Sequence, residues 1–241
     1  MKRPLDFFAI TFMMAFALAA CSDTSSGSAA TPNEEAATQT PAAATKLPTL
    51  TLIGHASLKI KTREGIVIYI VPYYKGDYSE KADIILVSHE HPDHNAINLV
   101  TQNKDCVVLR VKDTINQKDN SYNTFEYYGV KIEPVPATNK NHPLNSTNGF
   151  VLTFDGISVY HASDTSKIDQ MRALKAKNID YAFFPIDGQY NMGPAEATQA
   201  AEMVGAKHNI PFHINSADVK AFTPENLMLV NYGETIELSA Q

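Results

Sequence analysis

The sequence is short of cysteine, of basic residues and of long apolar runs, and each shortage argues against a class of protein. Its 241 residues contain 2 cysteines, which argues against a disulfide-stapled fold and against cysteine-based chemistry. Lys and Arg number 20 against 26 acidic residues, for a net charge of −6, which argues against a nucleic acid as partner. An apolar run from Phe7 to Ala20, broken only by Thr11, is too short to be a comfortable membrane span.

The N-terminus has the pattern of an export signal. Lys2 and Arg3 precede the apolar run, so residues 1–20 are predicted to be a signal peptide. The segment Leu18-Ala19-Ala20-Cys21 resembles the lipobox of bacterial lipoproteins, which implies that Cys21 becomes the acylated first residue. A plain secretory signal with an incidental cysteine is the alternative. We therefore expect export, with a lipid anchor on Cys21 that holds the protein at a bacterial cell membrane, facing the periplasm or the exterior.

A tether and one domain are predicted to follow the signal. Residues 21–46 are almost wholly small or polar, so they have nothing to bury that would offset the entropy of ordering, and we interpret them as a flexible tether. Residues 47–241 are long enough for one domain with a sizeable core, and they contain no second linker and no internal repeat. Cys106 begins an apolar run in this domain and is expected to be a buried thiol.

Short β-type runs outnumber helical patterns in this domain. The predicted strands are residues 49–53, 57–61, 66–71, 84–88, 107–111, 128–135, 150–154, 157–161, 181–185 and 210–214. Helices are predicted at 95–103, 165–177 and 193–204. Strands come first and β-α-β alternation comes late, which favours an α/β fold of two packed sheets flanked by helices.

The residues with the clearest chemistry follow the apolar strand that ends at Val87. They read Ser88-His89-Glu90-His91-Pro92-Asp93-His94. Residues two apart on an extended segment point the same way, so His89 and His91 should converge on one point. Pro92 forces a turn, after which Asp93 and His94 can face a second point nearby. Two imidazole nitrogens at the first point, and a carboxylate oxygen with an imidazole nitrogen at the second, suit zinc, manganese or iron. The alternative is a solvated histidine-rich loop that binds no metal.

The pattern His-x-His-x-Asp-His after a strand resembles the signature of the metallo-β-lactamase superfamily. Further segments are similar to its L-ascorbate-6-phosphate lactonase-like branch, namely Gly54 to Ser57, Tyr160 to Thr165, Met192 to Ala197 and Ile210 to His213. Together they span nearly the whole domain. The resemblance implies an αββα sandwich with a dinuclear metal site at one edge of its sheets, which agrees with the strand-rich pattern.

The resemblance also implies a set of metal ligands. The first metal would be bound by His89, His91 and His142, and the second by Asp93, His94 and His213. Asp164 would bridge the two metals. The metals would be two divalent ions, zinc first, with manganese or iron as alternatives. His142 is placed only by its order along the chain, so a surface-loop histidine stays open there, and His213 could instead be a core histidine.

Some neighbouring residues invite a supporting role, and others depart from the pattern. His55 and His161 could hold metal ligands in place, with core packing as the alternative. Tyr73, Tyr74 and Tyr190 could line a substrate pocket, with a structural role as the alternative. Val71 stands where the branch usually has aspartate, and we expect metal affinity or turnover to suffer. Ser163 replaces the usual glycine before the bridging aspartate, a smaller concern because serine fits most backbone conformations except those with positive φ.

These residues predict a metal-dependent hydrolase of a small molecule. Two divalent ions lower the pKa of a shared water, so a metal-bound hydroxide becomes available as nucleophile, and they stabilise the oxyanion that forms. Asp93 and Asp164 are the catalytic residues of this interpretation. The ions, the two carboxylates and the hydroxide leave about one net positive charge, so an anionic ester, lactone or phosphodiester is the expected substrate. A non-catalytic lipoprotein that keeps the fold for metal or ligand binding is the alternative, favoured by Val71, and no protein partner is evident.

Overall fold

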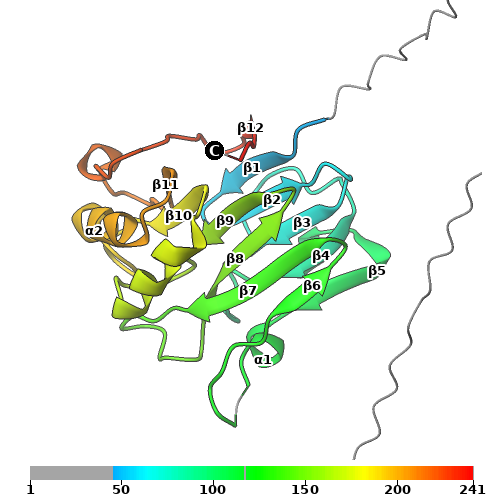
Figure 1. The fold of residues 1–241 in the computed structure, drawn as a ribbon, viewed down its shortest axis with the longest axis horizontal. Helices are drawn as coiled ribbons and strands as arrows, with labels where there is room; N and C mark the ends of the chain where they lie inside the picture. The colour runs from blue at the N-terminus through cyan, green and yellow to red at the C-terminus, as the bar shows by residue number, and fades with distance from the viewer. Residues whose placement is uncertain (1–45, 117, 241) are drawn as a thin grey trace, which may run out of the picture. The chain divides into compact units, whose positions relative to one another are not determined.

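Two six-stranded sheets form the framework of the described chain. The computed structural model describes residues 46–116 and 118–240, so the predicted signal peptide and all of the predicted tether except Lys46 lie outside the described residues. The first sheet has the strand order β12-β1-β2-β3-β4-β5, and the second has the order β11-β10-β9-β8-β7-β6 (Figure 1). Each sheet is mixed, because β3, β4 and β5 run parallel in the first and β9, β10 and β11 run parallel in the second.

The elements have the following bounds. The first sheet contains β1 (Thr49–Gly54), β2 (Ser57–Lys61), β3 (Val67–Ile70), β4 (Ala82–Leu86), β5 (Gln102–Leu109) and β12 (Thr235–Glu237). The second contains β6 (Phe125–Tyr127), β7 (Val130–Pro136), β8 (Asn148–Phe154), β9 (Ile157–His161), β10 (Tyr181–Pro185) and β11 (His208–Phe212). The helical segments are α1 (Val111–Thr114), α2 (Pro194–Val204) and the 3₁₀ segments Ile97–Leu99, Asp169–Lys177 and Val219–Ala221.

The main core lies between the two sheets. Side chains alternate along each buried strand, so Ile68 and Ile70 of β3 belong to the core between the sheets while Tyr69 packs on the outer side. In the same way, Phe183 of β10 belongs to that core, and Phe184 packs in a separate cluster with α2. Strands that are buried on both faces read as continuous apolar runs, which is why the sequence pattern predicts them well.

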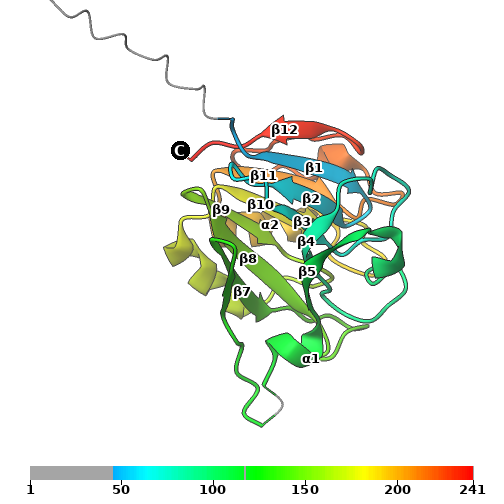
Figure 2. The same cartoon turned by 90° about the vertical axis from the view of Figure 1, so that its right-hand side faces the viewer.

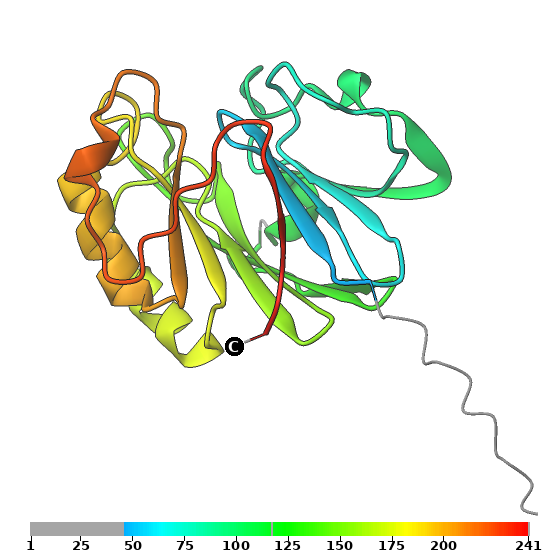
Figure 3. The same cartoon turned by 90° about the horizontal axis from the view of Figure 1, so that it is seen from above.

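The layers on the two outer faces are unequal. Helix α2 and the 3₁₀ segment Asp169–Lys177 pack against the outer face of the second sheet, and Figure 3 shows them outside β10 and β11. The outer face of the first sheet is covered by loops and by the short turn Ile97–Leu99, where Ile97 packs beside the buried Val100. Figure 2 shows loops instead of long helices beside β3, β4 and β5. The predicted α/β sandwich of two sheets with helices is confirmed, with one helical layer reduced.

Of the three predicted helices, one is wrong and one is confirmed in part. Residues 95–103 form the 3₁₀ turn Ile97–Leu99 and then begin β5. The strand was not predicted there because the first half of β5 is an exposed edge whose polar residues carry no strand pattern. Residues 165–177 form a 3₁₀ segment at Asp169–Lys177, in which Met171 and Leu174 are buried three residues apart, the spacing that stacks side chains in a 3₁₀ helix. The third predicted helix is confirmed as α2.

Other elements also differ from the sequence predictions. The short strands β6 and β12 and helix α1 were not predicted, since each has at most four residues. Cys106 is half-buried on β5 and not fully buried as expected, because β5 is an edge strand. In the described ranges, no helix is long and apolar enough to cross a membrane.

Candidate metal centre

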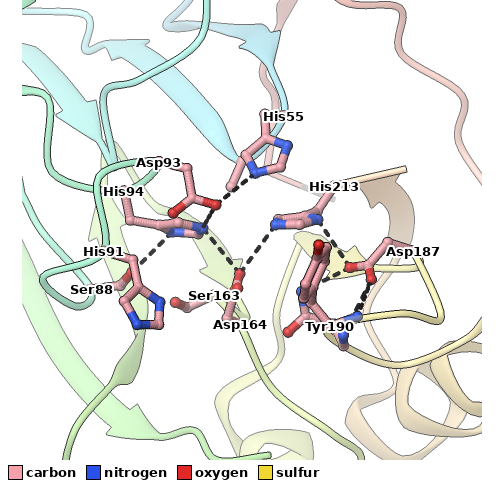
Figure 4. A network of polar contacts seen from close by, with 12 residues as sticks. His55, Ser88, His91, Asp93, His94, Ser163, Asp164, Asp187, Tyr190 and His213 are labelled. Atoms are coloured by element: carbon pink, nitrogen blue, oxygen red, sulfur yellow. Dashed lines mark hydrogen bonds and ion pairs between the residues drawn. The ribbon is translucent and has the colours of Figure 1, made fainter. Parts of the chain in front are cut away.

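The predicted site residues meet at one edge of the molecule, where parallel strands of both sheets end. The segment His89 to His94 follows β4, Asp164 follows β9, and His213 follows β11. His142 comes from the loop between β7 and β8. Figure 4 shows the side chains of His94, Asp164 and His213 pointing toward one another. Carboxyl ends of parallel strands are the usual place for a ligand site in α/β folds, because loops from neighbouring strands converge there.

Three histidines form a first group. The Nε2 of His142 lies 3.0 Å from the Nδ1 of His91. The ring of His89 is centred 4.8 Å from that of His91 and 4.4 Å from that of His142. His89 and His142 are buried, whereas His91 is exposed, so the group opens to solvent on one side. This placement favours the ligand interpretation of His142 over a surface-loop histidine.

A second group lies beside the first. One nitrogen or oxygen atom from each of His55, Asp93, His94 and His213 lies within 4.8 Å of the others. Asp164 joins the two groups: one of its oxygens lies within 4.8 Å of a nitrogen of His89 from the first group and of His94 from the second. Its Oδ1 is 3.2 Å from the Nε2 of His94 and 3.7 Å from the Nε2 of His213. The structure therefore brings together every residue of the predicted ligand set, and it adds His55.

Several buried atoms of these groups lack a hydrogen bond. The Nε2 atoms of His89 and His94 and the Oδ1 of Asp164 have no hydrogen-bond partner in the described part of the chain. A buried polar atom that stays unpaired costs about 1–3 kcal/mol, so three at one place indicate a missing ligand. Imidazole nitrogens and carboxylate oxygens are the donor set of zinc, manganese and iron. The residues present therefore fit divalent metal binding.

Burial and mutual contacts leave the donors in the right ionisation state. Burial, and after it the neighbouring His94, lowers the pKa of His89 to about 2, and burial also lowers the pKa of His142. A neutral imidazole offers a lone pair to a metal. Burial alone would raise the pKa of Asp164, but contact with His94 outweighs it and holds that pKa well below its usual range. His89 and His142 thus present neutral nitrogens, and Asp164 presents an ionised carboxylate.

Asp187 is a site residue that the sequence predictions missed. Its Oδ2 lies 3.0 Å from the Nδ1 of His213. Burial alone would raise the pKa of Asp187 and lower that of His213. The contact between the two side chains has the larger effect, so the pKa of Asp187 is lowered and that of His213 is raised. A carboxylate that orients a ligand histidine is common in metal sites, because it fixes the ring and its tautomer. A signal was available, since Asp187 follows the buried strand β10 much as Asp164 follows β9.

The supporting histidines have different partners. The Nε2 of His55 lies 3.4 Å from Asp93 Oδ2, which suits a role in holding that carboxylate. His161 is fully buried, donates from Nε2 to the carbonyl oxygen of Ala56 at 2.9 Å, and accepts at Nδ1 from the backbone N–H of Ser163 at 3.1 Å. His161 therefore holds the backbone of Ser163, the residue before Asp164, in place.

Four non-glycine residues around the site have a left-handed backbone. His55, Val71, Ser163 and His213 have φ values of 52°, 43°, 59° and 48°. Such values are uncommon outside glycine, and a β-branched residue such as Val71 is strained there. The expectation that Ser163 matters little was therefore wrong, because its φ is in the region where serine fits poorly.

Replacing Ser163 with glycine is expected to stabilise the metal-free protein. The left-handed conformation costs a non-glycine residue about 1–2 kcal/mol, and glycine avoids this strain. Glycine also loses more conformational freedom on folding, which offsets about 0.5–1 kcal/mol of the gain. We expect the free energy of unfolding, measured by urea denaturation, to rise by about 0.5–1 kcal/mol. Ser158→Gly on strand β9 is the control and should destabilise. Destabilisation by Ser163→Gly would mean that contacts of the Ser163 hydroxyl outweigh the strain.

Two cavities adjoin the grouped residues. One, of about 430 Å³, is lined by His91, Asp93, Asp164, His213 and Tyr190, among others. The second, of about 610 Å³, lies against the first histidine group and is bordered by Lys112, Asn141 and Ser146, among others. Both volumes are in the range of small-molecule sites. Tyr190 therefore lies where the sequence analysis expected it, at the wall of a pocket.

Comparison with known proteins gives consistent matches. A family described as Beta-lactamase superfamily domain matches residues 49–213. A UPF0173 metal-dependent hydrolase of Methanospirillum hungatei is 31% identical over 185 residues, which cover 70% of this chain and 84% of the relative.

Solved structures show the same similarity. A crystal structure from Parabacteroides distasonis, assigned as a metal-dependent hydrolase, has 31% identity and a TM-score of 0.65 over 76% of this chain and 91% of that chain. A metallo hydrolase from Ignicoccus hospitalis, at 20% identity, shares the fold with a TM-score of 0.64 over 81% of this chain and 100% of that chain.

Proposed function

Because the chain belongs to the beta-lactamase superfamily and to the metal-dependent hydrolases within it, we propose that it hydrolyses a small anionic substrate with the help of two divalent metal ions. The observation that carries this proposal is the position of Asp164: one of its oxygens lies within 4.8 Å of a nitrogen of His89 and of His94, one from each histidine group, and its Oδ1 has no hydrogen bond among the described residues. A buried carboxylate between clustered histidines is suited to bridge two cations.

The groups described above define which residues would hold each ion. His89, His91 and His142 would hold the first, Asp93, His94 and His213 would hold the second, and Asp164 would contact both. His55 would orient Asp93, and Asp187 would orient His213. Zinc is the first choice of metal for this set of imidazoles and carboxylates, with manganese or iron as alternatives.

The chemistry of the bound ions explains why hydrolysis is the proposed reaction. Divalent ions lower the pKa of water and stabilise negative charge that develops on a carbonyl or phosphoryl oxygen. The chain's own residues keep His89 and His142 neutral by burial, keep Asp164 ionised, and leave the exposed His91 side open to the cavities.

An anionic ester, lactone or phosphodiester is the proposed substrate class. Two divalent ions outweigh the charges of Asp93 and Asp164, so the centre of the site favours an anion. Lys112 adds a positive charge at the border of the 610 Å³ cavity. Apart from histidines, Glu90 is the only other charged residue that lines this cavity in the described chain. Glu90 pairs with Arg110 at 2.6 Å. The resemblance to ascorbate-6-phosphate lactonases points to a phosphorylated sugar lactone as the first compound to assay.

A substrate panel tests this proposal. We expect the metal-replete protein to hydrolyse lactones or esters that carry a phosphate or carboxylate, with weak turnover of neutral analogues. Lys112→Glu should raise KM for the anionic substrates by about thirtyfold, since a nearby exposed charge contributes on the order of 1 kcal/mol, and reversal doubles the change to about 2 kcal/mol. Lys104→Glu, on the exposed half of β5, is the control and should leave KM unchanged.

Two results would count against it. A clear preference for neutral substrates would contradict the charge argument. Metal binding without turnover of any compound would favour a binding protein that keeps the fold.

We further propose that the domain is exported and lipid-anchored. The support is the signal pattern of residues 1–20 and the lipobox-like segment that ends at Cys21, followed by the polar residues 22–46. The first strand of the domain begins at Thr49, shortly after this polar stretch. On this proposal, residues 21–46 are the tether between membrane and enzyme.

Cys21→Ala is expected to release the protein from the membrane. Lipid attachment at this cysteine would be lost, so the protein should move from the membrane fraction to the soluble fraction in a cell fractionation blot. Cys106→Ala, in the domain, is the control and should stay with the membrane. A wild-type protein that is already soluble would show that the lipobox interpretation is wrong.

A further inference from the structure

The side chain of Asn139 fixes the ring of His142. Its Oδ1 accepts the Nδ1–H of His142 at 2.9 Å, and it also accepts the backbone N–H groups of Asn141 at 2.8 Å and of His142 at 3.0 Å. An amide oxygen can only accept, so the ring proton of His142 is at Nδ1. The lone pair at Nε2 is then directed at the first histidine group, where His91 lies 3.0 Å away.

Asp187 makes an ion contact with His213 at the opposite end of the centre. Its Oδ2 faces the Nδ1 of His213 at 3.0 Å, and both side chains are almost completely buried. The other carboxylate oxygen accepts the backbone N–H groups of Gln189 at 2.9 Å and Tyr190 at 2.6 Å, so the carboxylate cannot turn away. Figure 4 shows Asp187 beside His213, on the side away from Asp164. Nε2 of His213 is again the atom that faces the cluster.

Asn191 connects these two ends. Its Nδ2 donates to Asp187 Oδ2 at 2.8 Å, and its Oδ1 accepts from Asn139 Nδ2 at 2.8 Å. Four hydrogen bonds or ion contacts therefore run without a break from His142 through Asn139, Asn191 and Asp187 to His213. The chain joins the outermost histidine of the first group to the outermost histidine of the second, and Asn191 contacts neither.

We propose that Asn191 is a positioning residue for both metal positions at once. Without it, the amide of Asn139 loses the only side-chain acceptor of its Nδ2 in the described chain, and Asp187 Oδ2 loses the donor that shares it with His213. The backbone N–H groups still hold the other oxygens, so we expect both histidines to lose part of their preference for the Nδ1-protonated form. The inference rests on the proposed two-metal function, because it concerns the two positions defined there. Partners of ligand histidines typically change metal affinity by about 10–100-fold when they are removed.

Zinc titration of the metal-free protein, in competition with a chromophoric chelator, tests the inference. We expect Asn191→Ala to lower the affinity of both positions by about tenfold or more. The matched control is Asn141→Ala, which removes a hydrogen bond from Asn141 Nδ2 to the carbonyl oxygen of Tyr190, 3.0 Å long, between the same two loops. This control lies outside the chain from His142 to His213, so both affinities should stay within about twofold of wild type.

A second measurement does not depend on metal. Nitrogen-15 NMR of the metal-free protein should show His142 and His213 protonated at Nδ1 in the wild type and in Asn141→Ala, and as mixed tautomers in Asn191→Ala. If the wild type binds no zinc, the proposed function fails, and the tautomers still decide the role of Asn191. The inference would be overturned if Asn191→Ala lost zinc affinity at only one position or kept the wild-type tautomers. It would also be overturned if Asn141→Ala lost as much zinc affinity as Asn191→Ala. If Asn191→Ala does not fold, Asn191→Ser is measured in its place.

Discussion

The Asp93→Ala variant is expected to lose about 10³-fold in metal-dependent hydrolysis while it remains folded. The side chain of Asp93 is 38% exposed and contacts His55 and His94 at 3.4 and 3.9 Å, so its removal leaves no hole in the core. A metal ion stabilises the transition state by several kcal/mol, and each 1.4 kcal/mol is about tenfold in rate. The measurement is kcat/KM on the best substrate of the panel, with the circular dichroism spectrum as the check of folding.

Two comparisons make this result decisive. Asp105→Asn changes another exposed carboxylate, on edge strand β5, and should retain wild-type kcat/KM. His91→Ala should match the loss of Asp93→Ala, because each removes an exposed ligand from one of the two proposed positions. A fully active Asp93→Ala protein would contradict the assignment of the metal centre.

Removal of metal is expected to abolish activity and to lower the melting temperature by about 10 °C. A ligand present at 1,000 times its Kd stabilises the native state by about 4 kcal/mol, and for a domain of this size each kcal/mol corresponds to about 2–4 °C. The measurements are turnover and a thermal melt before and after dialysis against a chelator, followed by addition of zinc, manganese or iron. The metal that restores both is the one that the site uses.

The Asp93→Ala protein is the control for this experiment as well. Because it lacks a ligand of the second position, its melting temperature should change less on chelation than that of the wild type. Activity that survives chelation in the wild type would contradict a metal-dependent reaction.

The predictability of the fold followed the burial of each strand. Strands β3, β4 and β10 are buried on both faces, and their apolar runs predicted them to within about two residues. The exposed half of β5 and the three-residue β12 carry polar side chains without a clear period, so the sequence offered no pattern there. Tertiary pairing alone places them in the sheet.

The site could be predicted where its residues are neighbours in sequence. His89 and His91 were expected to converge because they share one extended segment, and the structure places their ring centres 4.8 Å apart. Asp187 was missed because its partner His213 lies 26 residues further along, and no local pattern relates the two. The polar chain through Asn139 and Asn191 spans three loops, and such contacts appear only once the sheets have packed.

The spread of the ligands over the two sheets has a consequence for how the protein matures. The candidate ligands run from His89, after a strand of the first sheet, to His213, after a strand of the second, so a growing chain lacks the complete set of donors until residue 213 has been made. An unfolded chain rarely has a preformed metal site, and high affinity therefore arises only when the sheets have docked. The metal that the enzyme carries is then decided in the compartment where folding ends. On the proposed export, this compartment lies outside the cytoplasm, and the metals available there would determine the loading.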